Sequence, residues 1–588
     1  MVKIGHNAER PTDGRGLRSS RIPQFQDARI EKNGLQRHVG APIAGVVYPP
    51  QADLDRYVAA GCLAHETLAG AFHKAALAFP DNVALLGPDL CVTYREVDAR
   101  ATRLAAALLR QGLAPLDSVV FQLANSAELI YAFMACLKAG LIPICTLAAH
   151  REHEIGYLAN LAEAKLHIID EDTAKFDFSN FARAMQRSVP SLKLILQARG
   201  EPGEDALSLH RLIESIGLEE ATAVLDGVEL DPFQVAVYQL SGGSTGVPKI
   251  IPRFHNEYLH NMRAVAEWLG YRPDDVLFMP QPMVHNLNMG CCFGPILLTG
   301  GTVTITPDLQ ADTLVSLIRA TRPTWLMLGG PIVARLEAAI RAKDIDLANA
   351  RGVIAANSAP KLRSLLGVPV YHTFGITEGV IMFTRPGDPL EAQDTTHGRP
   401  VSRFDEVRIL RPGTEIDVAQ GEIGEPVFRG PYTTHGYLKA EERNKETFTS
   451  DGYYRSGDLM QERRIDGTSY YVFCGRIKDV VNRAGEKINC EEVEAAVVTH
   501  PAVAAIVAVP YPDPVYEERL CAVIIPRDGH SAPSVAELGA FLQSYGMAKF
   551  KWPERIEVVS AFPLTASGKI SRRALIEQVA QSVTQRQG

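Results

Sequence analysis

Short apolar runs alternate with helical patterns along most of the chain. Apolar residues recur at helical spacing over 100–113, where a glycine closes the segment, and this spacing predicts a helix. An apolar β-type run at 118–123 is followed by a second helical pattern over 126–139, which Gly140 ends, and then by a strand pattern at 142–147. This β-α-β rhythm predicts parallel sheets that are covered by helices.

The strand pattern returns further along the chain and then gives way to a different composition. Further strands are predicted at 235–240, 276–279, 302–305, 324–328 and 352–355. From about 400 to 475, short strands and turns with frequent Gly and Pro predict a β-rich subdomain, and mixed α/β character returns after Arg476. Residues 1–45 are polar, rich in Arg and Gly and without a clear period, which predicts a flexible arm. We therefore expect a large domain over 46–477 and a small one over 478–588.

The bulk composition is that of a globular protein with a sizeable core. Of the 588 residues 46% are hydrophobic and 22% charged, and the net charge of −8 gives no basic field for nucleic acid or an anionic membrane. The most membrane-like stretch, 130–148, contains Lys138, Gly140 and Pro143, so a buried helix and strand are expected there instead of a membrane span. The nine cysteines include no CxxC pair, which predicts neither a zinc site nor a disulfide framework. Without a secretion signal at the N-terminus, a cytoplasmic protein is expected.

The most informative segment is a glycine-rich stretch that follows a predicted strand and reads LSGGSTGVPK at 240–249. Glycines let backbone N–H groups point inward around an anion, while hydroxyls and a lysine donate hydrogen bonds to phosphate oxygens. A glycine-rich surface turn is the alternative, and the spacing is not that of a Walker loop. The candidate phosphate-binding residues are Ser241, Gly242, Gly243, Ser244, Thr245, Gly246 and Lys249.

This segment resembles the signature of the adenylate-forming superfamily, which includes acyl-CoA synthetases, peptide-synthetase adenylation domains and luciferases. Its extended form, SGGSTGVPKIIPRFHNEY at 241–258, is most similar to that of free-standing aryl-acid AMP ligases of the 2,3-dihydroxybenzoate and salicylate type. The resemblance runs from about Tyr57 to the end of the chain. It implies an α/β fold with two parallel-rich sheets and a β-rich subdomain in a large N-terminal domain, followed by a small mobile α+β C-terminal domain.

A second motif, YHTFGITEG at 371–379, resembles the next core sequence of the superfamily. The resemblance implies that Phe374 flanks the adenine, that Thr377 touches the α-phosphate and that Glu378 holds Mg²⁺. A buried carboxylate beside a triphosphate makes sense only with a cation. An ordinary strand-to-helix turn is the alternative. Gly375, Asn357 and Ser358 join the implied nucleotide-binding residues, and Thr245 and Glu378 join the implied catalytic residues.

The motifs YRSGDL at 454–459 and CGRIKD at 474–479 resemble the segments that hold the ribose. One carboxylate can accept hydrogen bonds from two neighbouring hydroxyls, so the resemblance implies that Asp458 grips both ribose hydroxyls, with Arg476 as its companion. Taken alone, an Asp or Arg in such a loop is usually only solvated.

The last part of the chain resembles the domain that rotates between adenylation and thioester formation. Lys478 occupies the hinge position, and hinges absorb large backbone changes at a few residues. The loop NRAGEKI at 482–488, with Gly485 and Lys487, would line the thiol tunnel; an exposed hairpin is the alternative. Lys569 ends the terminal motif PLTASGK and is the implied catalytic lysine. Its ammonium would meet both the α-phosphate and the attacking carboxylate.

The segment PMVHNLNMGCC at 282–292 resembles the lining of the acid pocket, where an asparagine at the place of Asn286 bonds the ortho hydroxyl of the ring. Cys291 stands where salicylate enzymes carry cysteine, which favours a ring with only a 2-hydroxyl because a thiol offers little to a second hydroxyl. Leu287-Asn288 replaces an aromatic-proline pair and Ala356-Asn357 replaces paired glycines, so another aryl or an alicyclic acid remains an alternative. The implied acid-binding residues are His285, Asn286, Cys291, Ala356 and Gly379.

The resemblance implies an ATP- and Mg²⁺-dependent ligase that makes an aryl-adenylate and passes the acyl group to a thiol. Coenzyme A is slightly favoured as the acceptor because of the altered pocket, and the phosphopantetheine arm of an aryl carrier protein is the alternative. A non-catalytic nucleotide-binding regulator would be expected to lose Lys569, Glu378 or Asp458, and all three are present. An enzyme that stops at the adenylate or transfers to an amine is a third alternative. A monomer or homodimer without nucleic-acid or membrane partners is expected.

Overall fold

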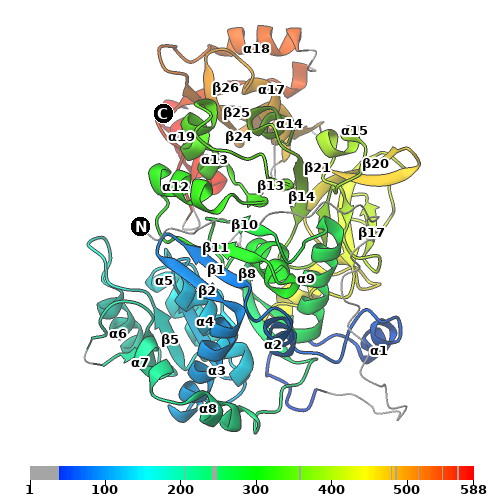
Figure 1. Cartoon of the computed structure of the whole chain (residues 1–588). Helices are drawn as coiled ribbons and strands as arrows, with labels where there is room; N and C mark the ends of the chain where they lie inside the picture. Colours follow the sequence, from blue (N-terminus) through cyan, green and yellow to red (C-terminus); the bar gives the residue numbers. More distant parts are fainter. Residues whose placement is uncertain are drawn as a thin grey trace, which may run out of the picture. The chain divides into compact units, whose positions relative to one another are not determined.

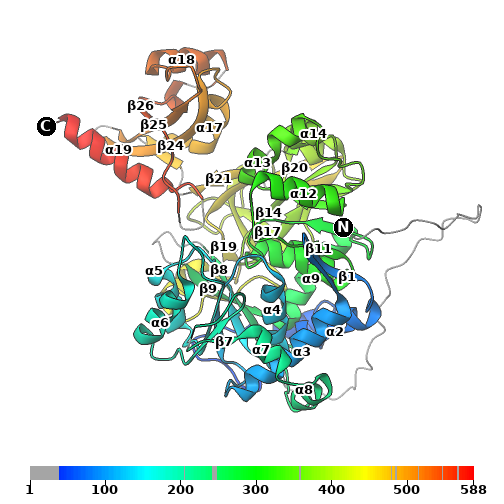
Figure 2. The ribbon, with the colours of Figure 1, turned by 60° about the vertical axis from the view of Figure 1, so that its left-hand side comes forward.

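The computed structural model describes most of the chain after its N-terminal arm (Figures 1 and 2). The described residues are 39–203, 205–241, 248–355, 359–477, 480–483, 486–513, 516–545, 547, 549–565 and 569–587. Most of the predicted arm over 1–45 therefore lies outside the described residues, and so does the predicted hinge Lys478.

The first of two parallel-rich sheets has the strand order β7-β6-β5-β3-β4-β8-β9. Its neighbours pair in parallel except at the edge, where β9 is antiparallel to β8. The strands are β3 (Ser118–Gln122), β4 (Ile142–Ile144), β5 (Leu166–Ile169), β6 (Leu194–Gln197), β7 (Leu207–Ser208), β8 (Val235–Ser241) and β9 (Lys249–Phe254).

The second parallel-rich sheet has the order β16-β15-β14-β13-β12-β10-β11-β1-β2. Its central strands are parallel and its edge strands antiparallel. The strands are β1 (Val83–Gly87), β2 (Leu90–Thr93), β10 (Val276–Phe278), β11 (Thr302–Thr304), β12 (Trp325–Met327), β13 (Gly352–Ala355), β14 (Val370–Gly375), β15 (Ile381–Phe383) and β16 (Arg399–Pro400). The predicted α/β class with two parallel-rich sheets is thus confirmed.

Helices surround these sheets (Figure 1). They are α1 (Gln51–Ala59), α2 (Leu68–Ala78), α3 (Tyr94–Arg110), α4 (Ala127–Ala139), α5 (Glu152–Leu161), α6 (Phe178–Ser188), α7 (Leu209–Glu214), α8 (Leu218–Leu225), α9 (His255–Leu269), α10 (Asn286–Asn288), the π-helix η1 (Met289–Phe293), α11 (Gly294–Thr299), α12 (Ala311–Thr321), α13 (Gly330–Arg341), α14 (Ala359–Leu366), α15 (Leu390–Thr395) and α16 (Glu441–Thr447). Among the described residues, no helix is both long and apolar enough to cross a membrane.

Local signals explain where the helices begin and end. Ser126 caps α4 by accepting a hydrogen bond from the N–H of Leu129, and Gly140 ends the helix in the left-handed conformation at φ 70°. Helix α3 begins six residues before the predicted start at 100, because Thr93 and Glu96 form a capping box ahead of the first periodic apolar residues.

The β-rich subdomain predicted around 400–475 is an antiparallel sheet of order β17-β18-β20-β21, with β19 paired to β18. Its strands are β17 (Glu406–Leu410), β18 (Ile423–Arg429), β19 (Tyr454–Arg455), β20 (Asp458–Ile465) and β21 (Thr468–Arg476). The register sets Asp458 directly opposite Arg476.

The C-terminal part has a sheet and an apolar core of its own. The sheet has the order β23-β22-β25-β24, with β26 paired to β25. Val481, Val493 and Leu538 belong to one cluster of buried residues that contains only C-terminal side chains. The elements are β22 (Val480–Arg483), β23 (Glu486–Asn489), α17 (Cys490–Val497), β24 (Val503–Asp513), β25 (Glu517–Pro526), α18 (Val535–Ser544), the 3-10 helix η3 (Lys549–Lys551), β26 (Arg555–Val558) and α19 (Arg572–Gln587). The domain boundary at 477/478 remains a prediction.

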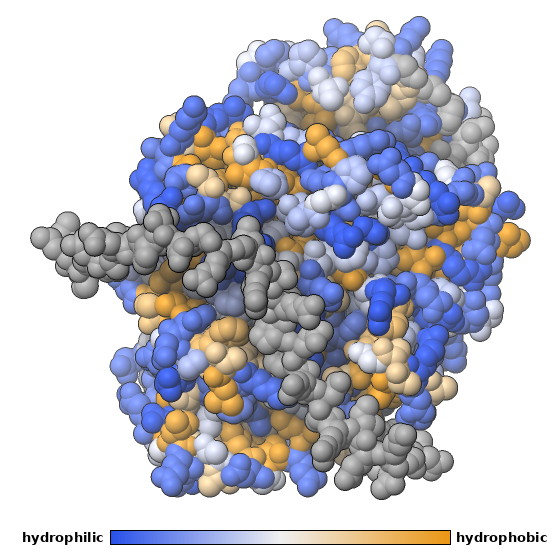
Figure 3. Space-filling model, turned by 45° about the vertical axis from the view of Figure 1, so that its right-hand side comes forward, coloured by the Kyte–Doolittle hydropathy of each residue, from blue (hydrophilic) through white to orange (hydrophobic). Residues whose placement is uncertain are grey.

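Hydrophobic and hydrophilic residues are mixed on the surface. Figure 3 shows one face on which hydrophobic residues lie in small groups between hydrophilic ones. Scattered apolar side chains of this kind are ordinary on protein surfaces.

Candidate active site

The predicted site residues lie after strands of the two parallel-rich sheets and in the β-rich subdomain. Ser241 ends β8, Lys249 begins β9, Gly375 ends β14 and Asn286 follows β10. Ligands of open α/β sheets bind in crevices outside the carboxyl ends of the strands. These four predicted residues therefore lie where this fold is expected to hold a ligand.

Tyr437 connects the predicted phosphate lysine to the predicted metal carboxylate. Its hydroxyl donates to Oε1 of the buried Glu378 at 2.9 Å, and Lys249 Nζ donates to the same hydroxyl at 3.3 Å. The Lys249 ammonium also lies 4.4 Å from the centre of the Tyr437 ring, and Tyr454 lies 3.0 Å from Tyr437, hydroxyl to hydroxyl. A cation and a carboxylate thus meet on one hydroxyl. Tyr437 is not predictable from the sequence, because a lone tyrosine after a glycine carries no specific signal.

A hard oxygen ligand such as Glu378 suits Mg²⁺, which is usually held by one or two carboxylates together with substrate phosphates and water. Within the described part of the chain, no group of three or more His, Cys, Asp or Glu side chains is arranged to hold a metal ion. The donor set therefore fits a magnesium ion that is bound mainly through its nucleotide.

Asp458 and Arg476 form a pair across the antiparallel strands β20 and β21. Arg476 Nε lies 3.4 Å from Asp458 Oδ1, and Asp458 is buried while Arg476 is exposed. Burial raises the pKa of Asp458 to about 6, and the guanidinium of Arg476 opposes that rise. Two groups predicted to share the ribose are brought together by the sheet register.

Phe374 belongs to a row of aromatic rings. Its ring centre lies 5.5 Å from that of Phe473, which is 6.0 Å from His397, and His397 stacks on His372 at 5.1 Å. His372 Nε2 accepts from the N–H of Ala359, so its proton sits on Nδ1 and is donated to the carbonyl of Thr396. The residue predicted to flank the adenine, Phe374, is thus packed against other aromatic rings.

Three of the predicted acid-binding residues, His285, Asn286 and Cys291, lie in or beside an unusual helical segment. Cys291 is fully buried within η1, a π-helix of the type that often occurs at functional sites. The next residue, Gly294, needs to be a glycine, because a Cβ at this position would lie 2.4 Å from the carbonyl oxygen of Met289. Burial raises the pKa of the Cys291 thiol to about 12, so this cysteine acts as an apolar lining group. Gly379 lies so close to Thr433 that a Cβ would come within 3.0 Å of its hydroxyl.

His285 and Lys569 lie within electrostatic range of each other. Desolvation by the surrounding protein lowers the pKa of His285 to about 4, and the positive charge of Lys569 is the second cause. Desolvation also lowers the pKa of Lys569, with Arg476 as the second cause. Both side chains are exposed to solvent. The charge of Lys569 thus acts on His285, and that of Arg476 acts on Lys569, although these two residues precede Lys569 by 284 and 93 positions in the chain.

Hydrogen bonds join Lys569 to Thr565. The N–H of Thr565 donates to the Lys569 carbonyl at 2.7 Å, and the N–H of Lys569 donates to the Thr565 hydroxyl at 3.2 Å. An isolated antiparallel bridge also pairs Leu564 with Ile570.

Several predicted site residues cannot be placed. Outside the described residues lie Gly242, Gly243, Ser244, Thr245, Gly246, Ala356, Asn357, Ser358, Lys478 and Gly485. Lys487 belongs to β23 by its backbone, but its side chain is not described.

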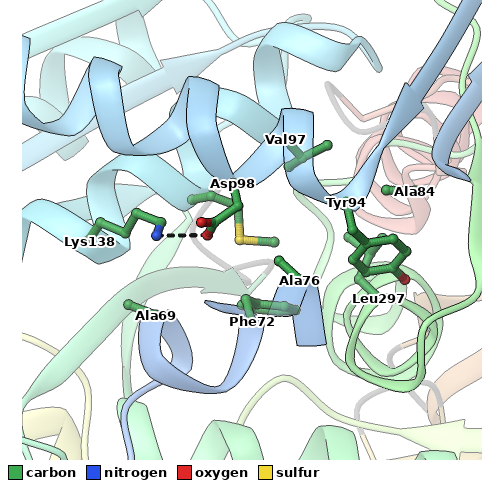
Figure 4. A pocket seen from close by; sticks show the side chains of 10 residues that line it. Ala69, Phe72, Ala76, Ala84, Tyr94, Val97, Asp98, Lys138 and Leu297 are labelled. Carbon is green, nitrogen blue, oxygen red and sulfur yellow. Dashed lines mark ion pairs between the residues drawn. The ribbon is translucent and has the colours of Figure 1, made fainter. Parts of the chain in front are cut away.

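Two other hollows of the molecule do not contain the predicted residues. A cavity of about 30 Å³ between α2, α3 and α4 is lined mainly by apolar side chains, with the ion pair Lys138–Asp98 at 2.8 Å beside it (Figure 4). It has room for about one water and not for an aromatic acid. A groove of about 1280 Å³ runs between α13 and α14, and the described residues that line it include none of the predicted site residues.

Comparison with known proteins decides the family. Residues 72–438 match the model of the AMP-binding enzyme family, and residues 492–569 match that of the AMP-binding enzyme C-terminal domain. The chain belongs to the AMP-binding enzyme family. The predicted membership of the adenylate-forming superfamily is confirmed, and this member is an AMP-forming ligase.

Curated relatives place the chain beside aryl-acid AMP ligases. It is 37% identical over 91% of its length to the 2,3-dihydroxybenzoate-AMP ligase of Bacillus subtilis, covering 97% of that protein. A salicylyl-CoA synthase / salicylate adenylyltransferase of Streptomyces is 35% identical (91% of this chain, 98% of the relative). The salicyl-AMP ligase / salicyl-S-ArCP synthetase of Mycobacterium tuberculosis is 34% identical (91% and 95%). The apo structure of Mycobacterium smegmatis MbtA superposes with a TM-score of 0.69 at 31% identity (91% and 99%).

Proposed function

We propose that this enzyme activates an aromatic carboxylic acid with ATP and loads the acyl group onto the phosphopantetheine thiol of a carrier protein. A carboxylate oxygen of the acid attacks the α-phosphorus of ATP and the bond to pyrophosphate breaks, which gives a bound aryl-adenylate. The carrier thiol, having lost its proton to solvent, then attacks the carbonyl carbon and displaces AMP. The observation that carries the proposal is that Lys249 and Glu378 share the hydroxyl of Tyr437, so that a cation suited to phosphate and a carboxylate suited to Mg²⁺ lie together.

The proposed roles follow from charge. Lys249 and Lys569 donate to phosphate oxygens, and Lys569 also meets the attacking carboxylate. Glu378 would hold Mg²⁺, which neutralises phosphate charge when bound. Asp458 and Arg476 hold the ribose, while Phe374 lies against the adenine. Asn286 and His285 contact the acid, and Cys291 lies against its ring.

The acceptor is proposed from the relatives and differs from the expectation that slightly favoured coenzyme A. One relative is named as an aryl-carrier-protein synthetase and another as a CoA synthase. Two pyochelin synthases of Pseudomonas aeruginosa are also 37% identical, which favours assembly-line chemistry. We therefore place the carrier protein first.

Mass spectrometry of the products tests the acceptor. The enzyme is incubated with Mg-ATP and 2-hydroxybenzoate, 2,3-dihydroxybenzoate or benzoate, alone, with coenzyme A, or with a phosphopantetheinylated aryl carrier domain. We expect adenylate alone in the first case and an acylated carrier domain in the third. An aryl-CoA product without acylated carrier would overturn the carrier assignment and leave the adenylation step standing.

Asp458 makes nucleotide binding depend on pH in this proposal. Its pKa of about 6 means that the carboxylate is mostly ionised at pH 7 and mostly protonated at pH 5. Only the ionised form accepts from both ribose hydroxyls, so ATP affinity should fall by about tenfold between those pH values. Calorimetric titration of ATP measures this change. The Asp458→Asn variant is the control, because it shares every other titration, including that of ATP itself. Parallel pH dependences in the two proteins would contradict the assignment.

A further inference from the structure

Two buried donors hold the side-chain oxygen of Asn286. Arg253 Nη1 donates to Asn286 Oδ1 at 3.0 Å, and the Tyr258 hydroxyl donates to the same atom at 2.9 Å. A guanidinium can only donate hydrogen bonds, so the atom that it meets must be the amide oxygen and not the nitrogen. The orientation of the Asn286 amide is therefore fixed by its surroundings.

The donors are themselves held rigidly. Arg253 is 1% exposed and forms a two-pronged ion pair with Glu257, in which both N···O distances are 2.9 Å. Burial raises the pKa of Glu257, but the charge of Arg253 and the N–H of Phe254 at 2.8 Å favour its carboxylate form. The guanidinium also lies 4.2 Å from the centre of the Tyr258 ring. Such paired geometry leaves the guanidinium little freedom to turn.

The same guanidinium reaches the nucleotide side of the site. Arg253 Nη1 donates to the carbonyl oxygen of Thr377 at 3.3 Å, so a single side chain ties β9 to Asn286 and to the segment that ends in Glu378. On the other side, Gln239 Nε2 donates to the Tyr258 hydroxyl at 3.3 Å. This hydroxyl accepts from Gln239 and therefore uses its own proton on Asn286.

The amide nitrogen of Asn286 has no such partner among the described residues. Its oxygen faces Arg253 and Tyr258, and no acceptor in the described part of the chain lies within hydrogen-bond distance of Nδ2. The side chain thus presents N–H donors, and no acceptor, to whatever occupies the acid pocket.

We propose that Arg253 and Tyr258 are positioning residues that aim the Asn286 amide N–H at the substrate, so that the pocket selects aromatic acids whose facing substituent accepts a hydrogen bond. The proposal rests on the proposed aryl-acid activation and concerns which acids are chosen. An ortho hydroxyl meets the requirement, because its oxygen accepts from Asn286 while its proton is donated to the carboxylate of the same molecule. An ortho amino group meets it poorly, because its lone pair is delocalised into the ring.

A ring without an acceptor leaves a buried N–H unsatisfied. Leaving a buried N–H without an acceptor lowers a binding constant by roughly 5- to 150-fold. We therefore expect the kcat/KM of the wild-type enzyme for 2-hydroxybenzoate to exceed that for benzoate and for 2-aminobenzoate by about this factor. The measurement is acid-dependent exchange of pyrophosphate into ATP with each of the three acids. A preference for 2-aminobenzoate would mean that the amide oxygen faces the acid, and would overturn the proposal.

Tyr258→Phe tests the positioning role while leaving the ion pair of Arg253 intact. We expect kcat/KM for 2-hydroxybenzoate to fall roughly three- to tenfold, as for the loss of one hydrogen bond, and that for benzoate to change less than about twofold. In an Asn286→Ala background the same substitution should have no further effect on 2-hydroxybenzoate. Tyr94→Phe is the matched control, because it removes another buried hydroxyl, which donates at 2.6 Å to the carbonyl of Gly301 between α3 and β11.

A purely structural role for Tyr258 gives a different pattern. Equal losses on 2-hydroxybenzoate and benzoate, or a full loss that persists in the Asn286→Ala background, would overturn the positioning role. Failure of aryl-acid activation itself is distinguishable, because no acid would then support exchange in the wild-type enzyme.

Discussion

Replacement of Lys569 by alanine is expected to slow aryl-adenylate formation by roughly 100- to 1000-fold while ATP affinity stays nearly unchanged. Negative charge builds up on the α-phosphate as pyrophosphate leaves, and an ammonium aimed at that oxygen stabilises the transition state more than bound ATP. Lys569 is hydrogen-bonded to Thr565, and its charge acts on His285, which we propose to contact the acid. Pyrophosphate release under single-turnover conditions measures the rate, and calorimetry measures the affinity.

Lys549→Ala is the matched control, because Lys549 is an exposed lysine of the same C-terminal part. It should leave both quantities unchanged. Acyl transfer from chemically supplied adenylate should also survive in Lys569→Ala, since that step needs no charge on a departing pyrophosphate. An adenylation rate within about threefold of wild type in Lys569→Ala would remove this lysine from the mechanism.

Glu378→Gln should also slow adenylation by roughly 100- to 1000-fold and raise the Mg²⁺ concentration needed for half-maximal rate. The glutamine keeps the volume of the side chain and an oxygen that can accept from Tyr437. The substitution therefore removes the charge with little change to the packing. The rate is measured at a series of Mg²⁺ concentrations and fixed ATP.

Two further variants distinguish the effect of the Glu378 carboxylate from the effects of its hydrogen-bond partner and of losing a negative charge elsewhere. Tyr437→Phe removes the hydroxyl shared with Lys249 and should cost only about three- to tenfold, the loss of one hydrogen bond. Glu391→Gln removes an exposed carboxylate on α15 and should have no effect. The metal assignment would be wrong if Glu378→Gln kept the wild-type Mg²⁺ dependence.

The sheets could be anticipated from the sequence because buried parallel strands appear as short continuous apolar runs. Strands β8, β10, β11, β12 and β13 lie within one or two residues of their predicted ranges. The π-helix at Met289–Phe293 could not be anticipated, since it depends on packing of Gly294 against Met289 and Met262 and not on a local pattern.

The candidate site likewise contains residues that the sequence predicts and residues that it does not. Lys249, Glu378, Asp458 and Arg476 were predicted because they stand in motifs whose order is itself a signal. Their supporting residues were not, because the contacts join positions far apart in the chain. Tyr437 meets Glu378 across 59 positions, and Arg253 meets Asn286 across 33. Neither Arg253 nor Tyr437 carries a sequence signal of this role; only the folded chain identifies them.

Exchange of labelled pyrophosphate into ATP, dependent on added aromatic acid and Mg²⁺, tests the central claim most directly. The account predicts that 2-hydroxybenzoate supports exchange in the wild-type enzyme without any thiol, and that exchange is lost in Lys569→Ala and Glu378→Gln. Exchange that no aromatic acid supports, in protein that binds ATP, would contradict aryl-acid activation.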